Sequence, residues 1–406
     1  MYILGGMLFS FEVLVKNFDE EDKLYQILKQ IDCKEIEKLN GCYIGPGRKR
    51  YDRVALFRAL ALKKLIGLPN TKSLVRCLCY SPLLAHWCGF DPMKNTPSES
   101  VFSRFEKDLN ELNLQKALSD LCNDLSSQVL AIVGSNGEIA IDSTDISAVE
   151  RPKKENETGA SFGHRTASAG ETEMFYGYKL HLAAVNTMIG PIPVAAKVAP
   201  ANYSDFEFAQ DLMNEAYYFH NKALGFAPRY YLMDAGYDAE YIYSQALKLN
   251  GQAIVKLNHR GKKGSYKEYT EYGTPLCPGN NPMVYYGSEK KNFTIKFRCP
   301  RVMGQPVDCQ CECGCSSVYG HVKRVSIKDN PRMFCNPHRG RRAWNEIYSH
   351  RTSIERLFSV LKGHLSMDRL TKRGIDKAFN DIMICLITFL AGTIVQLKDK
   401  ALPNVA

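Results

Sequence analysis

Residues 348–362 read Tyr-Ser-His-Arg-Thr-Ser-Ile-Glu-Arg-Leu-Phe-Ser-Val-Leu-Lys, and neither Gly nor Pro occurs between Trp344 and Lys362. This composition predicts a helix. At about 100° per residue, four polar side chains fall within one arc of about 60°; they are Tyr348, Arg351, Glu355 and Lys362. An apolar stripe beside the arc would anchor the helix. The pattern predicts a carboxylate held between two cations along the helix edge. The alternative is an amphipathic helix whose charged face is merely solvated.

Two short apolar stretches elsewhere each end in a carboxylate. Residues 138–145 read Glu-Ile-Ala-Ile-Asp-Ser-Thr-Asp, and residues 229–238 read Arg-Tyr-Tyr-Leu-Met-Asp-Ala-Gly-Tyr-Asp. Strand ends are where α/β sheets place their chemistry. Asp142, Asp234 and the helix-borne Glu355 would together offer oxygen ligands to two hard divalent cations.

The three motifs, in this order, resemble those of the bacterial insertion-sequence transposases of the DDE class, in the group with a Y-x-x-R-x-x-x-E-x-x-x-x-x-x-K signature. The resemblance runs from about residue 50 to the C-terminus. Asp142 matches the first acid, and Asp234 matches the second in a D-x-G-Y-D setting. The positions that match the helical signature are Tyr348, Arg351, Glu355 and Lys362.

The resemblance implies a ribonuclease-H-like catalytic core that cuts DNA and joins it to a target. Asp142, Asp234 and Glu355 would be the catalytic residues and the ligands of two Mg²⁺ (or Mn²⁺) ions, which lie about 3.5–4 Å apart in such sites. Arg351 and Lys362 would contact phosphates near the cut, and Tyr348 would stack on or hydrogen-bond the strand end. Water would attack first and free a 3′-OH, which would then attack target DNA.

Two further acids lie beside this triad. Asp145 should face the opposite side of its strand, and Asp238 is interpreted as a helix cap. Both are left outside the triad.

The charge of the chain is concentrated in one segment. The formal net charge is +10, and residues 260–342 carry 16 Lys and Arg against 6 Asp and Glu, which is also +10. Such a basic segment suits a polyanion such as double-stranded DNA. We find no convincing signal peptide. The apolar run at residues 382–395 is interpreted as a buried helix rather than a membrane span. We expect a bacterial cytoplasmic, nucleoid-associated protein with reduced cysteines and no membrane partner.

The fold class expected is α/β: a ribonuclease-H-like mixed sheet with an N-terminal all-helical domain and a strand-rich insertion before the last catalytic helix. We expect five segments. They are an N-terminal segment (1–50), a helical DNA-binding domain (51–125), the first part of the catalytic core (135–258), a basic Cys-rich insertion (259–342), and the second part of the core with the signature and C-terminal helices (343–400).

The helical domain offers a candidate reader of DNA. A capping box at residues 96–99 predicts a helix that starts at Pro97 and presents Arg104 and Lys107. This helix would belong to a helix-turn-helix unit, or to a domain that serves only packing or dimerisation. A second capping box at residues 204–207 predicts a helix to about His220. The polar loop from Arg151 to Thr172 follows the first acid, and it would either touch substrate or be a disordered surface loop.

The insertion suggests a DNA grip and a metal site. Its candidate phosphate contacts are Lys290, Lys291, Lys323 and Arg324. Seven of the 14 cysteines fall within it, at Cys277, Cys299, Cys309, Cys311, Cys313, Cys315 and Cys335. Some of them would hold one structural Zn²⁺, or all would be free thiols, because C-x-C spacing is less typical of zinc than C-x-x-C.

The function predicted is metal-dependent cleavage at transposon ends followed by strand transfer, by a homodimer in the DNA complex. Two alternatives stay open: a nuclease of the same fold that cuts without joining, and a DNA-binding copy whose site is dead. The presence of all three acids and both signature cations argues against decay. Neither the terminal repeats nor the oligomeric state can be read from the sequence.

Overall fold

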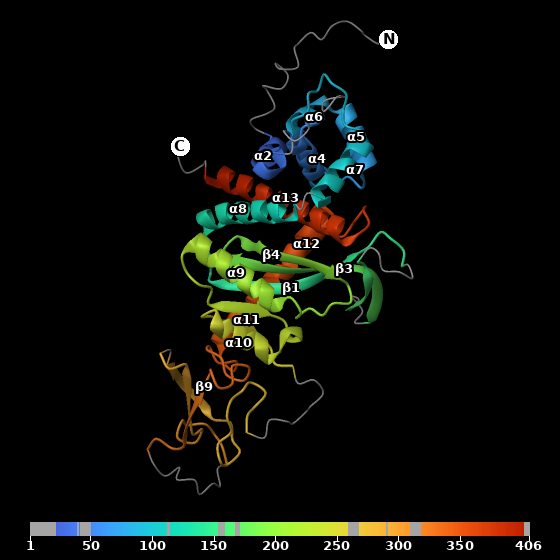
Figure 1. Cartoon of the computed structure of the whole chain (residues 1–406). Helices are drawn as coiled ribbons and strands as arrows, with labels where there is room; N and C mark the ends of the chain where they lie inside the picture. The colour runs from blue at the N-terminus through green and yellow to red at the C-terminus, as the bar shows by residue number, and fades with distance from the viewer. Residues whose placement is uncertain are drawn as a thin grey trace.

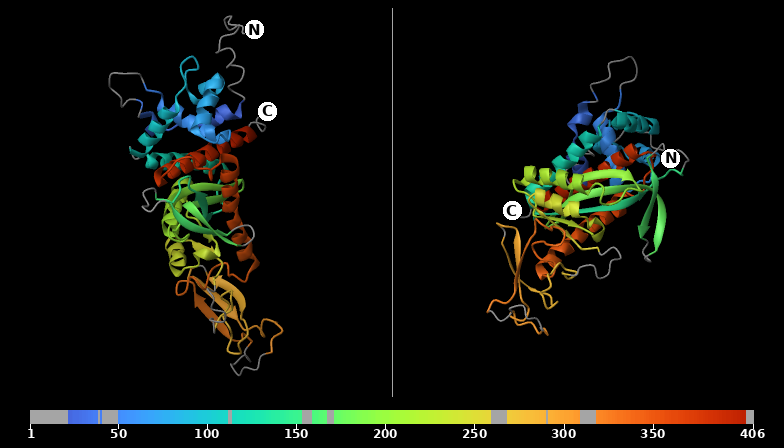
Figure 2. Two further views of the ribbon diagram at one scale, coloured as in Figure 1. Left: turned by 90° about the vertical axis from the view of Figure 1, so that its right-hand side faces the viewer. Right: turned by 60° about the horizontal axis from the view of Figure 1, so that its bottom comes forward.

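The computed structural model describes residues 22–38, 40, 50–111, 114–152, 159–166, 171–258, 268–289, 291–308 and 318–401. Helices from the N-terminal part stand at one end, a sheet covered by helices forms the middle, and the insertion lies at the opposite end (Figure 1). The two further views show the same elongated arrangement (Figure 2). This is the mixed α/β architecture expected, with a helical N-terminal region.

The central sheet is mixed, as the order of its connections predicts. Its strands run β2-β3-β1-β5-β6, and β4 pairs with β3. Strand β1 is antiparallel to β3 and parallel to β5, and β5 is parallel to β6. The strands are β1 (Glu138–Ser147), β2 (Ser161–Thr166), β3 (Thr172–Thr187), β4 (Gly190–Pro200), β5 (Tyr230–Met233) and β6 (Gln252–Val255).

The polar loop expected between Arg151 and Thr172 is in part a strand. Residues Ser161–Thr166 form β2 and pair with β3 along their whole length. Loop prediction failed here because the segment is polar: β2 is an edge strand, and one of its faces is open to solvent. Gly163 and Gly177 leave room for this packing, since a Cβ at Gly177 would come 2.1 Å from the Ile146 carbonyl oxygen.

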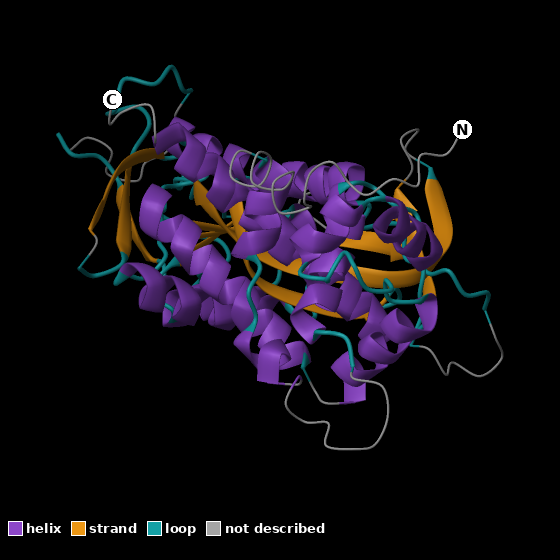
Figure 3. Cartoon of the chain, turned by 90° about the horizontal axis from the view of Figure 1, so that it is seen from above, coloured by secondary structure: helices purple, strands orange, loops and turns teal. Residues whose placement is uncertain are grey.

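Helices cover both faces of the sheet. In the side view the sheet lies between α9 and α10 on one side and α12 on the other (Figure 2), and from above helices hide most of it (Figure 3). These helices are α8 (Gln115–Val133), α9 (Ala209–Leu224), α10 (Glu240–Lys248), α11 (Arg342–Ser349), α12 (Ser353–Leu365) and α13 (Ile375–Ala401). Helix α9 begins at Ala209, not in the predicted capping box, because Asp205 is drawn into contacts with the sheet.

Helix α13 is long and apolar enough to cross a membrane by length and composition alone. However, 72% of its most apolar window, within Ile375–Asp399, is buried inside the protein. It packs on α8, α4 and β4. The prediction of a buried C-terminal helix is therefore confirmed, and the helix is longer than the run that suggested it.

The N-terminal helices form a small bundle that rests on α13. They are α2 (Lys23–Gln30), α3 (Lys34–Lys38), α4 (Arg53–Leu65), α5 (Thr71–Tyr80), α6 (Pro82–Cys88) and α7 (Glu99–Glu111). Pro82 does more than end α5, because it starts α6 as the first residue of a new helix. Helix α7 begins at Glu99 rather than Pro97. The Thr96 hydroxyl lies 2.7 Å from Cys79 Sγ, so its side chain is engaged away from the helix start.

The insertion contains a three-stranded sheet with its own small core. Its strands are β7 (Val284–Glu289), β8 (Thr294–Arg298) and β9 (Val322–Ser326). Asp238 joins this part to the catalytic sheet, and its side chain is fully buried. It accepts hydrogen bonds from Arg332 Nε (2.9 Å) and Nη2 (2.6 Å). Burial alone would raise the pKa of Asp238, but hydrogen bonds from Arg332, the Asn258 N–H and the Tyr243 hydroxyl, with the Arg332 charge, together lower the pKa. The interpretation of Asp238 as a helix cap was wrong: it is the acidic partner of an anchoring ion pair.

Candidate active site

Parallel pairing of β1 and β5 brings Asp142 and Asp234 together, although only Asp234 follows the end of its strand, because β1 continues past Asp142 to Ser147. Ala140 faces Leu232 in the register of these strands. Asp142 lies two residues beyond Ala140, and Asp234 lies two residues beyond Leu232. Side chains two residues apart lie on the same face of a strand. The two carboxylates therefore lie on one side of the sheet, at the end where β5 stops.

The electrostatics of Asp142 show how close the acids are. Its pKa is raised from 3.8 to about 7, first by burial and then by the charges of Asp234 and Glu355. The backbone N–H of Ser143 donates to Asp142 Oδ1 at 2.8 Å, and together with the charge of Arg351 it opposes the shift. Gly236 donates its N–H to Asp234 Oδ1 at 2.8 Å, which fixes the turn after β5. Three acids thus share one electrostatic environment around a mostly buried carboxyl group.

The third acid lies on α12, which packs against β1. Arg351 donates to Glu355 Oε1 at 2.6 Å, and its side chain is only 18% exposed. The Tyr348 ring stacks on Trp344 with 4.8 Å between ring centroids. The Arg351 guanidinium lies 5.9 Å from the Tyr348 centroid. Arg351 is therefore largely buried against its neighbours, whereas Glu355 is 51% exposed, so the stripe is in part the solvated face of the alternative interpretation.

The angular spacing of the signature residues was derived for one regular α-helix. The stretch is not one. Helix α11 ends at Ser349, residues His350–Thr352 form a 3₁₀ turn, and α12 begins at Ser353. A 3₁₀ turn has about 3.0 residues per turn instead of 3.6, so it changes the rotation between Tyr348 and Glu355. Arg351 still pairs with Glu355, and Lys362 reaches β1 at the Asp145 carbonyl oxygen.

Lys362 and Asp145 contact each other at the edge of the site. Lys362 Nζ donates to the Asp145 carbonyl oxygen at 2.7 Å and lies 3.8 Å from its carboxylate. Arg165 of β2 approaches the same carboxylate at 3.3 Å. Asp145 thus has cationic partners of its own, which agrees with leaving it outside the triad. Contact between Lys362 and a DNA phosphate stays a prediction.

Sequence reasoning missed Asp205 and Tyr237 as members of this region. Ser143 Oγ donates to Asp205 Oδ1 at 2.6 Å, and Lys179 Nζ donates to the same oxygen at 2.8 Å. The Tyr237 side chain is 1% exposed, and its hydroxyl has no hydrogen-bond partner among the described residues. Burial and the nearby Asp142, Asp205 and Asp234 raise its pKa. The Tyr in D-x-G-Y-D was the one available signal, whereas Asp205 had been assigned to a capping box.

The donor chemistry of the acids suits a divalent cation, although they are not gathered around one point. Carboxylate oxygens are the ligands that Mg²⁺ and Mn²⁺ prefer, and a cation would relieve the repulsion that raises the pKa of Asp142. Within the described residues, no three His, Cys, Asp or Glu side chains lie close enough to form a ready metal site. Glu355 is turned to Arg351, so metal binding by all three acids requires this carboxylate to reorient.

The zinc prediction is only partly covered by the described residues. Cys309, Cys311, Cys313 and Cys315 lie outside them. Cys277 belongs to the core of the insertion. Cys335 packs with Leu232, Ile254 and Trp344 of the catalytic part. Cys299 is fully buried. Cys335 is therefore separated from Cys277, and a zinc site built from the others stays a prediction.

The side chains that are candidate DNA contacts in the insertion point in different directions. Lys290 lies outside the described residues. Arg324 pairs in register with Lys296 and is exposed, so both belong to the open face of the small sheet. Lys323 turns the other way, with Nζ 4.9 Å from the Tyr269 centroid and 3.7 Å from the Glu268 carboxylate. Lys291 is exposed in the turn between β7 and β8.

On the helical domain, Arg104 and Lys107 of α7 line a cavity of about 540 Å³. Arg50 and Arg53 line it too, and Arg53 is paired with Asp108 at 2.6 Å. The cavity walls therefore carry more positive than negative charge. This distribution suits a DNA phosphate as well as a base edge.

Comparison with known families agrees with this site. A model described as "Transposase DDE domain" matches residues 134–390, which is more than half of the chain. The chain belongs to the DDE transposases. A second model, "Transposase domain (DUF772)", matches residues 12–108 and covers the N-terminal helices. No curated protein matches the sequence. These matches do not distinguish the Y-R-E-K group, so membership of that group stays a prediction.

Membership of the family indicates the general type of chemistry at the site. The domain is that of a transposase, an enzyme of the nucleotidyl-transferase type that acts on DNA, and the family generally uses divalent metal ions. The family match does not assign roles to individual residues.

Asp142→Asn should stabilise the metal-free chain more at about pH 8 than at about pH 4. The pKa of Asp142 is raised to about 7 in the folded chain. The stability due to its bound proton is present below the unfolded pKa and is lost as pH rises through 7. Asn does not titrate, so the gain of the variant over wild type should grow across this window by roughly 1 kcal/mol or more, since one pKa unit corresponds to about 1.4 kcal/mol. Thermal melts in a chelator at both pH values measure the difference in stability between the variant and the wild type. An equal difference at both pH values would contradict the raised pKa of Asp142.

Proposed function

We propose that this transposase cuts DNA at the ends of its element and joins the freed ends to target DNA. The observation that carries the proposal is the common electrostatic environment of Asp142, Asp234 and Glu355, supplied by two adjacent strands and the helix packed on them. Strand cleavage and strand joining are the same phosphoryl transfer with different attacking oxygens. One site can therefore do both.

The chemistry asks for charge neutralisation at two oxygens. Water attacks the phosphorus at the element end, the P–O bond to the 3′ oxygen breaks, and a proton is lost from the water. The freed 3′-OH then attacks a target phosphodiester and releases a 3′-OH of the target. Two Mg²⁺ or Mn²⁺ ions, when bound, supply positive charge to the attacking and the leaving oxygen. Asp142, Asp234 and Glu355 would hold them.

The chain's own cations would orient the DNA. Arg351 is held in place by Glu355 and packs over Tyr348, so its planar fork can face a phosphate near the cut. If Glu355 turned toward a metal, Arg351 would lose this partner and could pair with the phosphate instead. Lys362 would approach the backbone as a point charge from the Asp145 side. Tyr348 would stack on or hydrogen-bond the strand end.

The remaining segments would hold the DNA. We place end recognition on the helical domain (51–125) and a backbone grip on the insertion (259–342), with the core formed by residues 135–258 and 343–400. The DNA-bound form would be a homodimer that engages transposon ends and target in the bacterial cytoplasm, at the nucleoid. A nuclease that does not join strands is the second candidate, and an assay that detects joined product separates the two.

Removal of any one acid should abolish Mg²⁺-dependent cleavage of element ends. We expect Asp142→Ala, Asp234→Ala and Glu355→Ala each to lower the rate by at least about 10³-fold, and the losses should be strongly non-additive because the three act as one unit. Binding of end DNA should be nearly unchanged.

Asp145→Asn is the matched control, because it removes a nearby carboxylate charge but keeps the carbonyl that Lys362 contacts. Its effect should be mild. Cleavage by Glu355→Ala at close to the wild-type rate would remove the main support for the proposed site.

Arg324→Ala should weaken DNA binding and lower the slope of log K against log[salt] by about 0.9, the contribution of one phosphate contact. Lys323→Ala is its neighbour on the inner face, where the cation contacts Tyr269 and Glu268. It should leave the slope unchanged. Titrations of random duplex DNA at several salt concentrations measure both, and equal slopes for the two variants would move the grip away from the open face.

Arg104→Ala should reduce the preference for element ends more than it reduces affinity for random DNA, if Arg104 reads base edges. Ser103→Ala, on an exposed neighbouring position of α7, is the control and should change neither. Competition binding with end and random duplexes measures the ratio. Equal losses on both DNAs would make Arg104 a backbone contact.

A further inference from the structure

A polar cluster, buried except for the half-exposed His350, ties the signature helix to the strand that carries the first acid. The cluster consists of Glu138, Asn186, His350 and Ser353. Glu138 begins β1, four residues before Asp142, and Asn186 lies near the end of β3. His350 begins the 3₁₀ turn, and Ser353 begins α12, two residues before Glu355. Glu138, Asn186 and Ser353 are 6%, 4% and 7% exposed, so their polar groups depend on one another.

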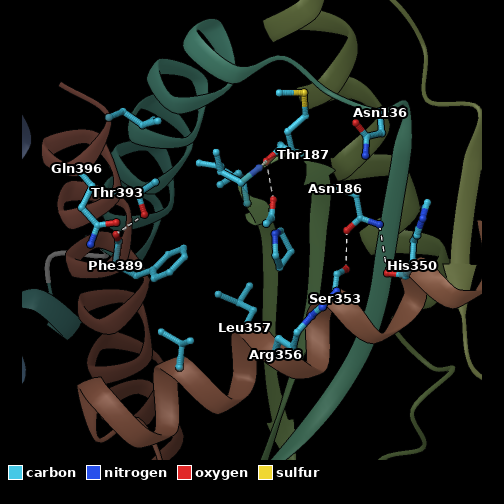
Figure 4. Close-up of a pocket in the computed structure, with 17 residues that line it drawn as sticks. Asn136, Asn186, Thr187, His350, Ser353, Arg356, Leu357, Phe389, Thr393 and Gln396 are labelled. Carbon is cyan, nitrogen blue, oxygen red and sulfur yellow. Dashed lines mark hydrogen bonds between the residues drawn. The ribbon is translucent and has the colours of Figure 1, made fainter. Parts of the chain in front are cut away.

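The hydrogen bonds form one connected set, of which Figure 4 shows those that Asn186 makes with Ser353 and His350. His350 Nδ1 lies 2.9 and 3.1 Å from the two carboxylate oxygens of Glu138. Asn186 Nδ2 donates to Glu138 Oε2 at 3.3 Å and to the His350 carbonyl oxygen at 3.4 Å. Ser353 Oγ donates to Asn186 Oδ1 at 2.6 Å. The set therefore joins β1 and β3 to both ends of the 3₁₀ turn.

The turn needs such support because local capping does not provide it. Thr352 precedes α12 with helical dihedral angles and makes no side-chain cap hydrogen bond. Ser349, before the turn, makes none either. The chain could continue here as α-helix or as 3₁₀-helix, and the two differ by about 20° per residue in rotation. The external hydrogen bonds to His350 and Ser353 select the 3₁₀ form.

This selection acts on the catalytic geometry. The cluster fixes where α12 starts, and Glu355 lies in the first turn of α12. The opposite end of the cluster is on the strand of Asp142. The cluster itself is set apart from the acids: Asn186, His350 and Ser353 line a cavity of about 600 Å³ to which Asp142, Asp234 and Glu355 do not contribute.

We propose that Glu138, Asn186, His350 and Ser353 are positioning residues that set the placement of Glu355 relative to Asp142, and hence the affinity of the site for divalent cations. This inference rests on the proposed function of the triad. Groups that orient metal ligands typically affect metal affinity or activity by 10–100-fold when they are removed. A cluster that served stability alone would leave metal affinity unchanged.

The test compares Glu138→Ala with a matched buried carboxylate. Glu150 is 7% exposed and accepts hydrogen bonds from Tyr178 Oη (2.6 Å) and the Gly374 N–H (3.4 Å), away from the signature helix. Mn²⁺ binding to the full chain is followed by electron paramagnetic resonance. End cleavage is measured against Mg²⁺ concentration, and thermal melts report stability.

Glu138→Ala should weaken Mn²⁺ binding and raise the half-saturating Mg²⁺ concentration, each by about tenfold, with a lower maximal cleavage rate. Binding of end DNA should be unchanged. Glu138→Gln should be close to wild type, because an amide oxygen can still accept from His350 Nδ1. His350→Asn should also be mild, because its amide nitrogen can take the place of Nδ1. Glu150→Ala should lower the melting temperature without changing Mn²⁺ affinity.

Equal behaviour of Glu138→Ala and Glu150→Ala, with unaltered Mn²⁺ affinity in both, would overturn the inference. If Glu138→Ala does not fold, Ser353→Ala decides, since it deletes one hydrogen bond and should show the same loss of Mn²⁺ affinity in weaker form. The proposed function fails in a different way, namely when the unmodified chain gives no metal-dependent cleavage, and the Mn²⁺ measurement still judges the cluster in that case.

Discussion

Burial of one carboxylate in the field of two others is the constraint on which the catalytic part depends. Asp142 is mostly buried, and both burial and its neighbours Asp234 and Glu355 raise its pKa. Two of these groups are fixed by the backbone, because parallel β1 and β5 put them two residues beyond a shared register pair. Without a cation the chain tolerates the arrangement by protonating Asp142 and by pairing Glu355 with Arg351. A site that is costly when empty favours the binding of positive charge.

Such a site must be held by rigid neighbouring elements, and the other strands and helices of the core are these elements. The apolar β1 is flanked by β3 and β5, so the strand that carries Asp142 cannot shift without breaking two ladders. Helix α12 buries Ile354, Leu357, Phe358 and Leu361, and it packs against β1. Helix α13 then covers α8 and α4, joining the catalytic core to the N-terminal bundle. The polar edge of α12 is thus one side of a helix whose opposite side is core.

Local patterns predicted the parts of this structure that local chemistry determines. The apolar stretch at residues 229–238 contains β5 (Tyr230–Met233), and the apolar run at residues 382–395 lies within α13. The pattern of the signature helix predicted one regular α-helix and missed the 3₁₀ turn, because Glu138 and Asn186, which contact this turn, lie far away in sequence. Asp205 and Asp238 were assigned to local caps for the same reason. Their actual partners, Lys179 and Arg332, are brought to them only by the tertiary fold.

The position of the insertion in the chain has a mechanical consequence. It leaves the core after β6 and returns just before α11, so it stands between the second acid and the helix of the third. Asp238, four residues after Asp234, is held by Arg332 of the insertion, and the pair is inaccessible on the Asp238 side. Breaking such a pair would leave a buried charge without a partner, which makes the joint stiff. A load placed on the open face of β7–β9 by bound DNA would therefore be passed to the turn that carries Asp234 and to the start of the signature helix.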